Sequence, residues 1–232
     1  MRSNWPCDSP VTTHHSPNQI RALHLIAGVL VFTVMTLTLG EIAEDVRNGE
    51  PLTLTDVRFS NWLHTHAWPP LTKVMWGITW LHTSAVVCVA AVLLGIYLWR
   101  RRELYWVVTL WVSVFGGVLL NNILKLIFHR TRPHFRDAIQ ALTTYSFPSG
   151  HTMTAAAFYG SLAAFCIAHC KSWPLRILAV VIAMTLIMLV AFSRVYLGAH
   201  YLSDVLGAIA EGAAWLALSL TGLYYFWNRK PQ

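Results

Sequence analysis

The sequence predicts an all-α, polytopic membrane protein in which six transmembrane helices form one bundle. Three observations support this fold class. Of the 232 residues, 56% are hydrophobic and only 12% are charged, which is not the composition of a soluble domain. Several apolar stretches exceed the ~20 residues that a helix needs to cross the bilayer core. These stretches are continuously apolar instead of alternating in polarity, so a transmembrane β-barrel is not favoured.

The helices are expected in order along the chain, at 20–39, 72–99, 104–128, 152–168, 175–192 and 202–227. The first apolar run is too long for a signal peptide and lacks a small-residue cleavage site. In the connection at 41–71, Asp56 is expected to cap a short helix. Two pairs of metal-ligand residues, His64 with His66 and Cys166 with Cys170, have no further ligand nearby. No metal site is therefore predicted.

The distribution of Lys and Arg predicts the orientation of the bundle. With six spans both termini share one side, which holds nine of the 17 basic residues. The other side holds eight, and three of these belong to the motifs described below, which leaves five. The prediction is a bacterial inner-membrane protein with a disordered cytoplasmic tail at 1–19, a transmembrane domain at 20–228 and a cytoplasmic tail at 229–232. The net charge of +7 is then explained by topology and an anionic substrate, and not by nucleic acid.

Three polar motifs stand at the ends of apolar runs: KLIFHRTRP (125–133), SFPSGH (146–151) and SRVYLGAHYLSD (193–204). Ionisable groups are costly there and indicate function. In a six-span topology the connections that carry these motifs fall on the outer face, so they can converge on one pocket. His200 and Asp204 are four residues apart, a spacing that lets the carboxylate hold the imidazole. Alternatively, His200 is only a helix-end histidine satisfied by a neighbouring acid.

The residue types in these motifs describe a phosphate-binding pocket. Lys125, Arg132 and Arg194 provide three cations, and the arginine fork matches two phosphate oxygens. The backbone amides at Ser149 and Gly150 stand where a helix begins, which is a ready anion site. Each residue also has a structural interpretation: the lysine could snorkel, Arg194 could pair with the acid of the third motif, and the serine could be only an N-cap.

The chemistry then needs a nucleophile and an acid. We expect His200 to attack phosphorus and form a phosphohistidine, with Asp204 orienting it. His151 would protonate the leaving oxygen and then help to activate water. The fixed cations neutralise the phosphoryl oxygens, so no metal or other cofactor is expected. A neutral nucleophile and a protonated acid predict a bell-shaped dependence of activity on pH.

The motifs read in order as Lys-x6-Arg-Pro, Pro-Ser-Gly-His and Ser-Arg-x5-His-x3-Asp. This pattern resembles the type 2 phosphatidic acid phosphatase superfamily, over about residues 55–225. That superfamily contains membrane lipid phosphatases and soluble vanadium haloperoxidases. The resemblance implies the same roles for Lys125, Arg132, Ser149, Gly150, His151, Arg194, His200 and Asp204. The chain departs from the family at Leu202, where proline is frequent, which concerns the start of the last helix.

The expected function is hydrolysis of a lipid phosphate in the membrane: undecaprenyl diphosphate, phosphatidic acid or phosphatidylglycerol phosphate. A lipid phosphotransferase that uses the same phosphohistidine is one alternative, and a transporter that only binds lipid phosphate is another. Glu211 shares the helical face of Asp204, about 10 Å deeper at ~1.5 Å per residue. It is expected either to line a lipid groove or to pair with another helix.

Overall fold

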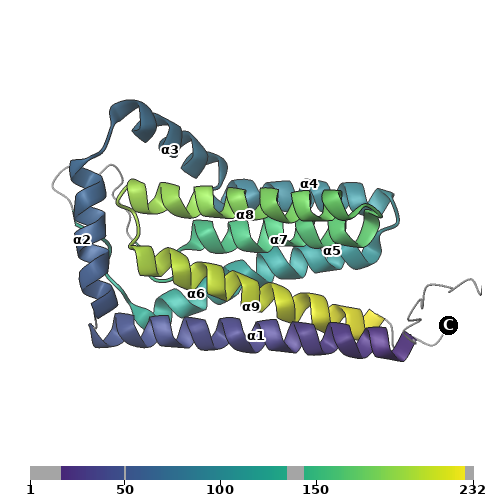
Figure 1. Ribbon diagram of the computed structural model, residues 1–232. Helices are drawn as coiled ribbons and strands as arrows, with labels where there is room; N and C mark the ends of the chain where they lie inside the picture. The colour runs from purple at the N-terminus through teal and green to yellow at the C-terminus, as the bar shows by residue number, and fades with distance from the viewer. Residues whose placement is uncertain (1–16, 50, 135–143, 228–232) are drawn as a thin grey trace, which may run out of the picture.

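The computed structural model describes residues 17–49, 51–134 and 144–227, and in these ranges every regular element is helical. The all-α prediction is confirmed (Figure 1). The elements are α1 (Pro17–Asn48), α2 (Pro51–Thr65), α3 (Pro69–Leu81), α4 (Ser84–Arg100), α5 (Leu104–Trp111), a π-helical turn (Val112–Gly116), α6 (Gly117–Phe128), α7 (Gly150–His169), α8 (Trp173–Tyr196) and α9 (Leu202–Trp227).

Five helical segments are long and apolar enough to cross a membrane, and a sixth is obtained if α3 and α4 count as one span. The first helix is longer than predicted at both ends, because it begins at Pro17 and runs through the acidic residues to Asn48. Most of the tail expected at 1–19 and all of the tail expected at 229–232 lie outside the described residues.

The span expected at 72–99 is not one continuous helix, because α3 and α4 are separate helices bent by 49°. Thr83 caps α4, with its side-chain oxygen accepting from the Val86 amide at 3.4 Å. His82 fills the break. Its Nδ1 lies 3.0 Å from the Ile78 carbonyl, and its Nε2 is hydrogen-bonded to the Tyr159 hydroxyl on α7. The apolar run therefore continues through a break that partners from another helix stabilise.

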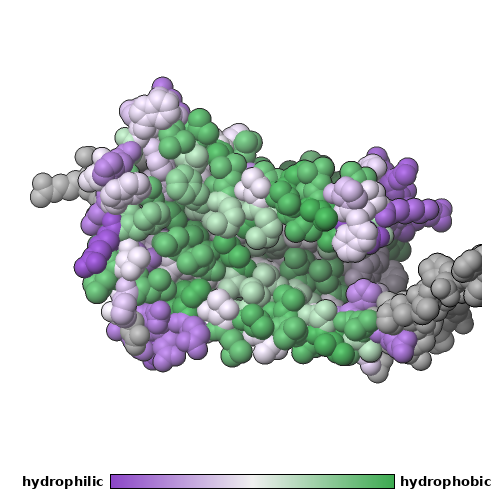
Figure 2. Space-filling model, in the orientation of Figure 1, coloured by the Kyte–Doolittle hydropathy of each residue, from purple (hydrophilic) through white to green (hydrophobic). Residues whose placement is uncertain are grey.

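The helices form one elongated bundle in which α7 packs against α8 and α9, and α1 lies along α9 (Figure 1). The start of α1 and the end of α9 lie at one end of this bundle. At the other end α2 crosses the bundle and contacts α1, α8 and α9. Figure 2 shows hydrophobic side chains over the middle of the visible face and hydrophilic ones toward both ends, as a bilayer requires.

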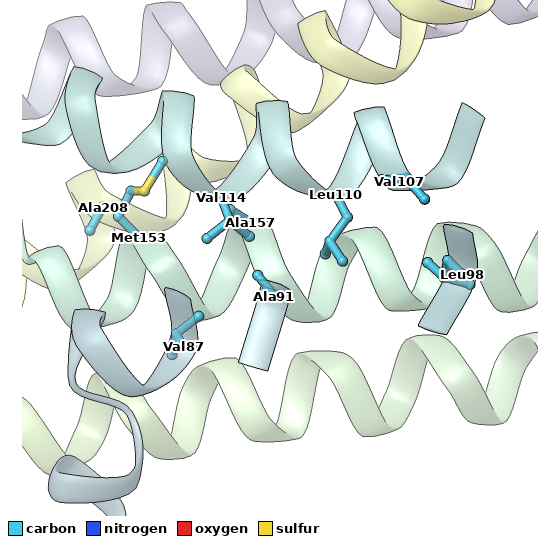
Figure 3. Packing of buried hydrophobic residues seen from close by; sticks show 9 residues of the cluster. All are labelled: Val87, Ala91, Leu98, Val107, Leu110, Val114, Met153, Ala157 and Ala208. Carbon is cyan, nitrogen blue, oxygen red and sulfur yellow. The ribbon is translucent and has the colours of Figure 1, made fainter. Parts of the chain in front are cut away.

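Small side chains allow close packing in the core (Figure 3). Ala91, Ala157 and Ala208 are fully buried at points where helices meet. At Gly95 on α4, an added Cβ would lie 2.3 Å from Nε1 of Trp111, which donates to the Ala91 carbonyl at 3.1 Å. Only glycine leaves room for this indole between α4 and the α5 segment.

Candidate active site

The three motifs meet at the end of the bundle that α2 crosses. The start of α4, the α6 helix, the start of α7, the end of α8 and the connection before α9 surround a cavity of about 260 Å³. Its lining consists of Ser84, Val118, Asn121, Asn122, Lys125, Arg132, Thr144, Gly150, His151, Thr154, Arg194 and His200. Six of the eight predicted site residues are in this lining, and both histidines are among them. Ser149 and Asp204 lie behind it.

His200 presents a lone pair to the cations of the cavity. Nη1 of Arg132 lies 3.1 Å from Nε2 of His200, and an arginine can only donate. Nε2 is therefore the acceptor, and the ring proton belongs on Nδ1, 3.4 Å from Oδ2 of Asp204. Burial, reinforced by Arg132 and opposed by Asp204, lowers the pKa of His200 to about 3. The imidazole is neutral at physiological pH, as a nucleophile must be.

Asp204 is fully buried and receives donors on both carboxylate oxygens. Oδ2 accepts from the Ser146 hydroxyl and, at 2.8 Å, from the Tyr201 amide, in addition to facing His200. Oδ1 accepts from Nη1 of Arg130 at 2.6 Å. Because an ionised carboxylate is the form that only accepts, this set of donors fixes Asp204 as an anion that orients the imidazole.

Arg130 joins Asp204 to α2, a link that the sequence analysis missed. Its Nη2 lies 2.8 Å from Oδ2 of Asp56, and its guanidinium lies 4.5 Å from the centroid of the Tyr201 ring. Asp56 also accepts from the Ser203 amide at 2.9 Å. Burial opposes the charge on Arg130, but the carboxylates of Asp204 and Asp56 outweigh it and raise its pKa.

These contacts correct one expectation and decide one alternative. Asp56 does not cap its own helix, because it lies inside α2 and is 1% exposed. The ion-pair partner of Asp204 is Arg130 instead of Arg194, which lines the cavity. One signal in the sequence pointed to Arg130: it stands two residues before the motif arginine, on the same connection.

Backbone carbonyls hold two of the cavity's cations. Arg132 donates from Nη1 to the Ala199 carbonyl at 2.6 Å and from Nε to the Thr144 carbonyl at 2.7 Å. Nζ of Lys125 donates to the Tyr145 carbonyl at 2.8 Å. Arg194 completes the set from the end of α8 and is 1% exposed. Since none of the described lining residues is acidic, the cavity is a cationic site suited to phosphate.

Ser149 is placed differently from the phosphate ligand that we expected. Its amide donates to the Asp204 carbonyl at 3.1 Å, and its hydroxyl lies 3.1 Å from that of Thr152. The N-terminus of α7 therefore reaches the cavity through Gly150 and His151. A Cβ at position 150 would lie 3.2 Å from Oδ1 of Asn121, so a side chain there would crowd the cavity wall.

Glu211 pairs with another helix, which is one of the two alternatives predicted for it. Nδ2 of Asn121 donates to Oε2 of Glu211 at 2.8 Å and reaches the Pro148 carbonyl at 3.5 Å. Glu211 is 1% exposed and does not line the cavity. Asn121 does line it, and so connects the buried carboxyl to the cavity.

Sequence comparison matches residues 106–228 to the PAP2 superfamily, a segment that contains all three motifs. The chain belongs to this superfamily. The matched segment starts later than the 55–225 that we expected, and it excludes Asp56 and Ser84. Among the residues that the structure describes, no group of three or more His, Cys, Asp or Glu side chains could hold a metal ion.

The relatives of this PAP2 chain include named phosphatases. It is 38% identical over 146 residues to phosphatidylglycerophosphatase B of Bacillus subtilis, covering 62% of this chain and 71% of the relative. It is 31% identical over 134 residues to undecaprenyl-diphosphatase BcrC of the same organism, covering 54% and 62%. With lipid A 1-phosphatase of Rhizobium etli it shares 39% over 121 residues, 48% of this chain and 47% of that protein. This chain thus spans about half of that relative's length.

Two solved structures share the fold. The crystal structure of a transmembrane PAP2-type phosphatidylglycerolphosphate phosphatase from Bacillus subtilis matches with a TM-score of 0.72 and 28% identity, covering 88% of this chain and 97% of that one. LpxE of Aquifex aeolicus matches with a TM-score of 0.56 and 21% identity, covering 72% and 94%, which supports the fold alone. The chain is therefore a multi-pass membrane protein with the PAP2 phosphatase fold.

Proposed function

We propose that this protein hydrolyses the phosphomonoester or diphosphate of a membrane lipid through a phosphohistidine on His200. The observation that carries the proposal is the direction of His200. Its unprotonated Nε2 faces a cavity lined by Lys125, Arg132 and Arg194, while Nδ1 faces the Asp204 carboxylate. Binding of an anion alone would need the cations but not an oriented, neutral imidazole.

The first step transfers the phosphoryl group to the protein. The three cations bind the non-bridging oxygens and stabilise the charge that they gain. Nε2 of His200 forms a bond to phosphorus, while the bond from phosphorus to the lipid oxygen breaks. His151, which lines the same cavity, donates a proton to that oxygen. The Nδ1 proton stays on the ring, where Asp204 offsets the positive charge of the phosphohistidine.

The second step returns the enzyme to its starting state. His151, now unprotonated, accepts a proton from a water molecule. The water oxygen attacks phosphorus, the bond to Nε2 breaks, and inorganic phosphate leaves. Atoms and charges balance without a further reactant.

A lipid substrate follows from the position of the cavity at one end of an apolar bundle. A phosphate headgroup can enter while the acyl or prenyl chains stay in the bilayer. The names of the relatives support phosphatidylglycerol phosphate or undecaprenyl diphosphate, and phosphatidic acid has the same chemistry. We place the protein in a bacterial inner membrane, with the termini in the cytoplasm and the cavity on the outer side.

Phosphate release tests this function directly. Purified protein in micelles is given a panel of lipid mono- and diphosphates in the presence of a chelator. We expect inorganic phosphate without an added acceptor, and loss of turnover in His200→Ala. His169→Ala, an exposed histidine far along α7, is the matched control and should keep activity.

Three results would contradict parts of the proposal. Loss of turnover in chelator would overturn the metal-free mechanism. Phosphate that appears only on an acceptor lipid would indicate the phosphotransferase. Lipid phosphate that binds but never turns over would indicate the transporter.

A further inference from the structure

A second and larger cavity lies at the end of the bundle opposite the active site. It has a volume of about 1100 Å³. Its walls come from the start of α1, the start of α5, the end of α7 and the end of α9, with Arg176 near the start of α8. The catalytic cavity uses the other ends of α7 and α8 and the connection before α9, so the two cavities are separated along the length of the bundle.

Small side chains create this groove. Ala27, Gly28, Ala164, Ala168, Ala213 and Ala217 form its walls where larger residues would fill it. At Gly28 an added Cβ would lie 1.9 Å from Oγ1 of Thr221, so α1 and α9 touch there and close one wall. Along α1 the lining runs from Arg21 to Val31, about 15 Å at ~1.5 Å per residue. That is roughly half of a ~30 Å hydrocarbon core, the depth of one leaflet.

The mouth of the groove is aromatic and cationic. Tyr105, Trp106, Tyr224 and Trp227 line it where helices end, the level at which such side chains meet lipid headgroups. Arg21 and Arg176 also line it, and none of the described lining residues is acidic.

The two arginines are available to a ligand. Arg176 uses its Nε for the Cys170 carbonyl at 2.7 Å, but its Nη groups make no hydrogen bond to the described residues. Arg21 forms neither an ion pair nor a hydrogen bond within the described part of the chain. The first 16 residues contain one acidic residue, Asp8, and one basic residue, Arg2.

We propose that this groove binds one anionic phospholipid, with its phosphate at Arg21 and Arg176 and an acyl chain between α1 and α9. An apolar groove of one leaflet's depth, with unpaired cations at headgroup level, fits this ligand better than a water-soluble one. The connections at the same end add Arg100, Arg101, Arg102 and Lys171, a positive surface that attracts anionic lipids.

Native mass spectrometry with dioleoyl phosphatidylglycerol and dioleoyl phosphatidylcholine measures this binding. We expect one tightly bound phosphatidylglycerol per chain and weaker binding of phosphatidylcholine. Each basic residue near an anionic headgroup contributes roughly fivefold in affinity, so Arg21→Gln with Arg176→Gln should raise Kd about 25-fold. Arg58→Gln, an exposed arginine on α2 at the opposite end of the bundle, is the matched control.

A second variant leaves the arginines in place and fills the groove. Ala168→Trp should displace the bound lipid, whereas Val180→Trp, on the exposed face of α8, should not. The melting temperature of each variant in detergent reports that it is folded. Arg132→Gln, in the catalytic cavity, should keep the bound phosphatidylglycerol.

Four outcomes would overturn the proposal. These are equal affinity for the two lipids, an unchanged Kd in the double arginine variant, loss of the lipid in Arg132→Gln, and binding that occurs only after residues 1–16 are deleted. The third would place the lipid in the catalytic cavity, and the fourth would assign the groove to the N-terminal segment. A failure of the proposed phosphatase activity would leave the binding measurement unaffected.

Discussion

Asp204 takes its donors from three separate parts of the chain. Ser146 comes from the connection before α7, Tyr201 from the connection before α9, and Arg130 from the connection after α6. Arg130 also binds Asp56 on α2. The carboxylate that faces His200 is therefore held in turn by a buried ion pair, and in the proposed mechanism Arg130 and Asp56 are positioning residues.

Removing Arg130 should slow catalysis more than it weakens binding. In Arg130→Gln a buried carboxylate loses a charged donor, which costs about 1–3 kcal/mol and corresponds to a loss of roughly 5- to 150-fold in kcat. KM should change little, because Arg130 does not line the cavity. Arg47→Gln, an exposed arginine at the end of α1, is the control.

Asp56→Asn should also lower kcat with little change in KM. In the double variant with Arg130→Gln, the loss of kcat, expressed as free energy, should be smaller than the sum of the two single losses. The values of kcat and KM for the unchanged chain, the two single variants and the double variant form a double-mutant cycle. Strict additivity, or an effect on KM alone, would show that the ion pair does not orient Asp204 through a shared network.

The lowered pKa of His200 makes the folded state sensitive to acid. Its ordinary pKa of 6.5 falls to about 3 on folding, so between these values the unfolded state binds the proton more strongly. Stability therefore rises with pH across this window and falls as pH drops from 6.5 toward 3. The contribution of this residue is on the order of 3–5 kcal/mol.

Thermal unfolding in detergent at several pH values checks this linkage. His200→Gln should flatten the acid dependence relative to the unchanged chain, and the exposed His169→Gln should not. Parallel curves for all three proteins would show that His200 titrates like a solvated imidazole. Because the pKa of His200 is lowered to about 3, the acid limb of the bell-shaped dependence of activity on pH should lie near pH 3.

At the scale of elements, the junction of α4 with α5 depends on one glycine. Gly95→Ala would place a methyl group against the Trp111 indole, 2.3 Å from Nε1, and disturb its bond to the Ala91 carbonyl. Overpacking of this kind costs about 1–3 kcal/mol. Gly77→Ala in α3 is the matched control, since nothing lies within 4 Å of its added Cβ.

The control substitution should be neutral or stabilise the protein by about 0.5–1 kcal/mol, because alanine is the better helix former. The melting temperatures of the Gly95→Ala and Gly77→Ala variants are compared in one detergent, and Gly95→Ala should melt at the lower temperature. Equal melting temperatures would mean that Trp111 can leave its position without cost.

The sequence predicts some elements well and others poorly for a physical reason. Long apolar runs identify the helices at 104–128, 150–169, 173–196 and 202–227, because the bilayer imposes their length. The break at His82 escapes detection because Tyr159, which stabilises it, lies 77 residues away. The three motifs identify the cavity, but the pairs of Arg130 with Asp56 and Asn121 with Glu211 span 74 and 90 residues. No local pattern reports such pairs.

At the scale of the whole molecule, the orientation in the membrane is a prediction that labelling can test. The end of the bundle near α2 should face outward and the α7–α8 connection inward. Asn61→Cys on α2 and Lys171→Cys are exposed or partly exposed positions at opposite ends. In a background without other cysteines, an impermeant maleimide added to intact spheroplasts should label position 61 and spare position 171. The reverse pattern would invert the topology.

The contact of Asp56 with Ser203 and Arg130 also limits how the protein can be divided. Residues 106–228 carry all three motifs, yet Arg130 and Ser203, which lie beside Asp204, are held by Asp56 on a helix that precedes this segment. A fragment that starts at α5 should be inactive even if it inserts into the membrane. Supplying residues 1–103 as a separate polypeptide should restore turnover, because that polypeptide provides the carboxylate of Asp56. A chimaera that joins residues 106–228 to the N-terminal half of another protein should be active only if that half places a carboxylate where Asp56 lies.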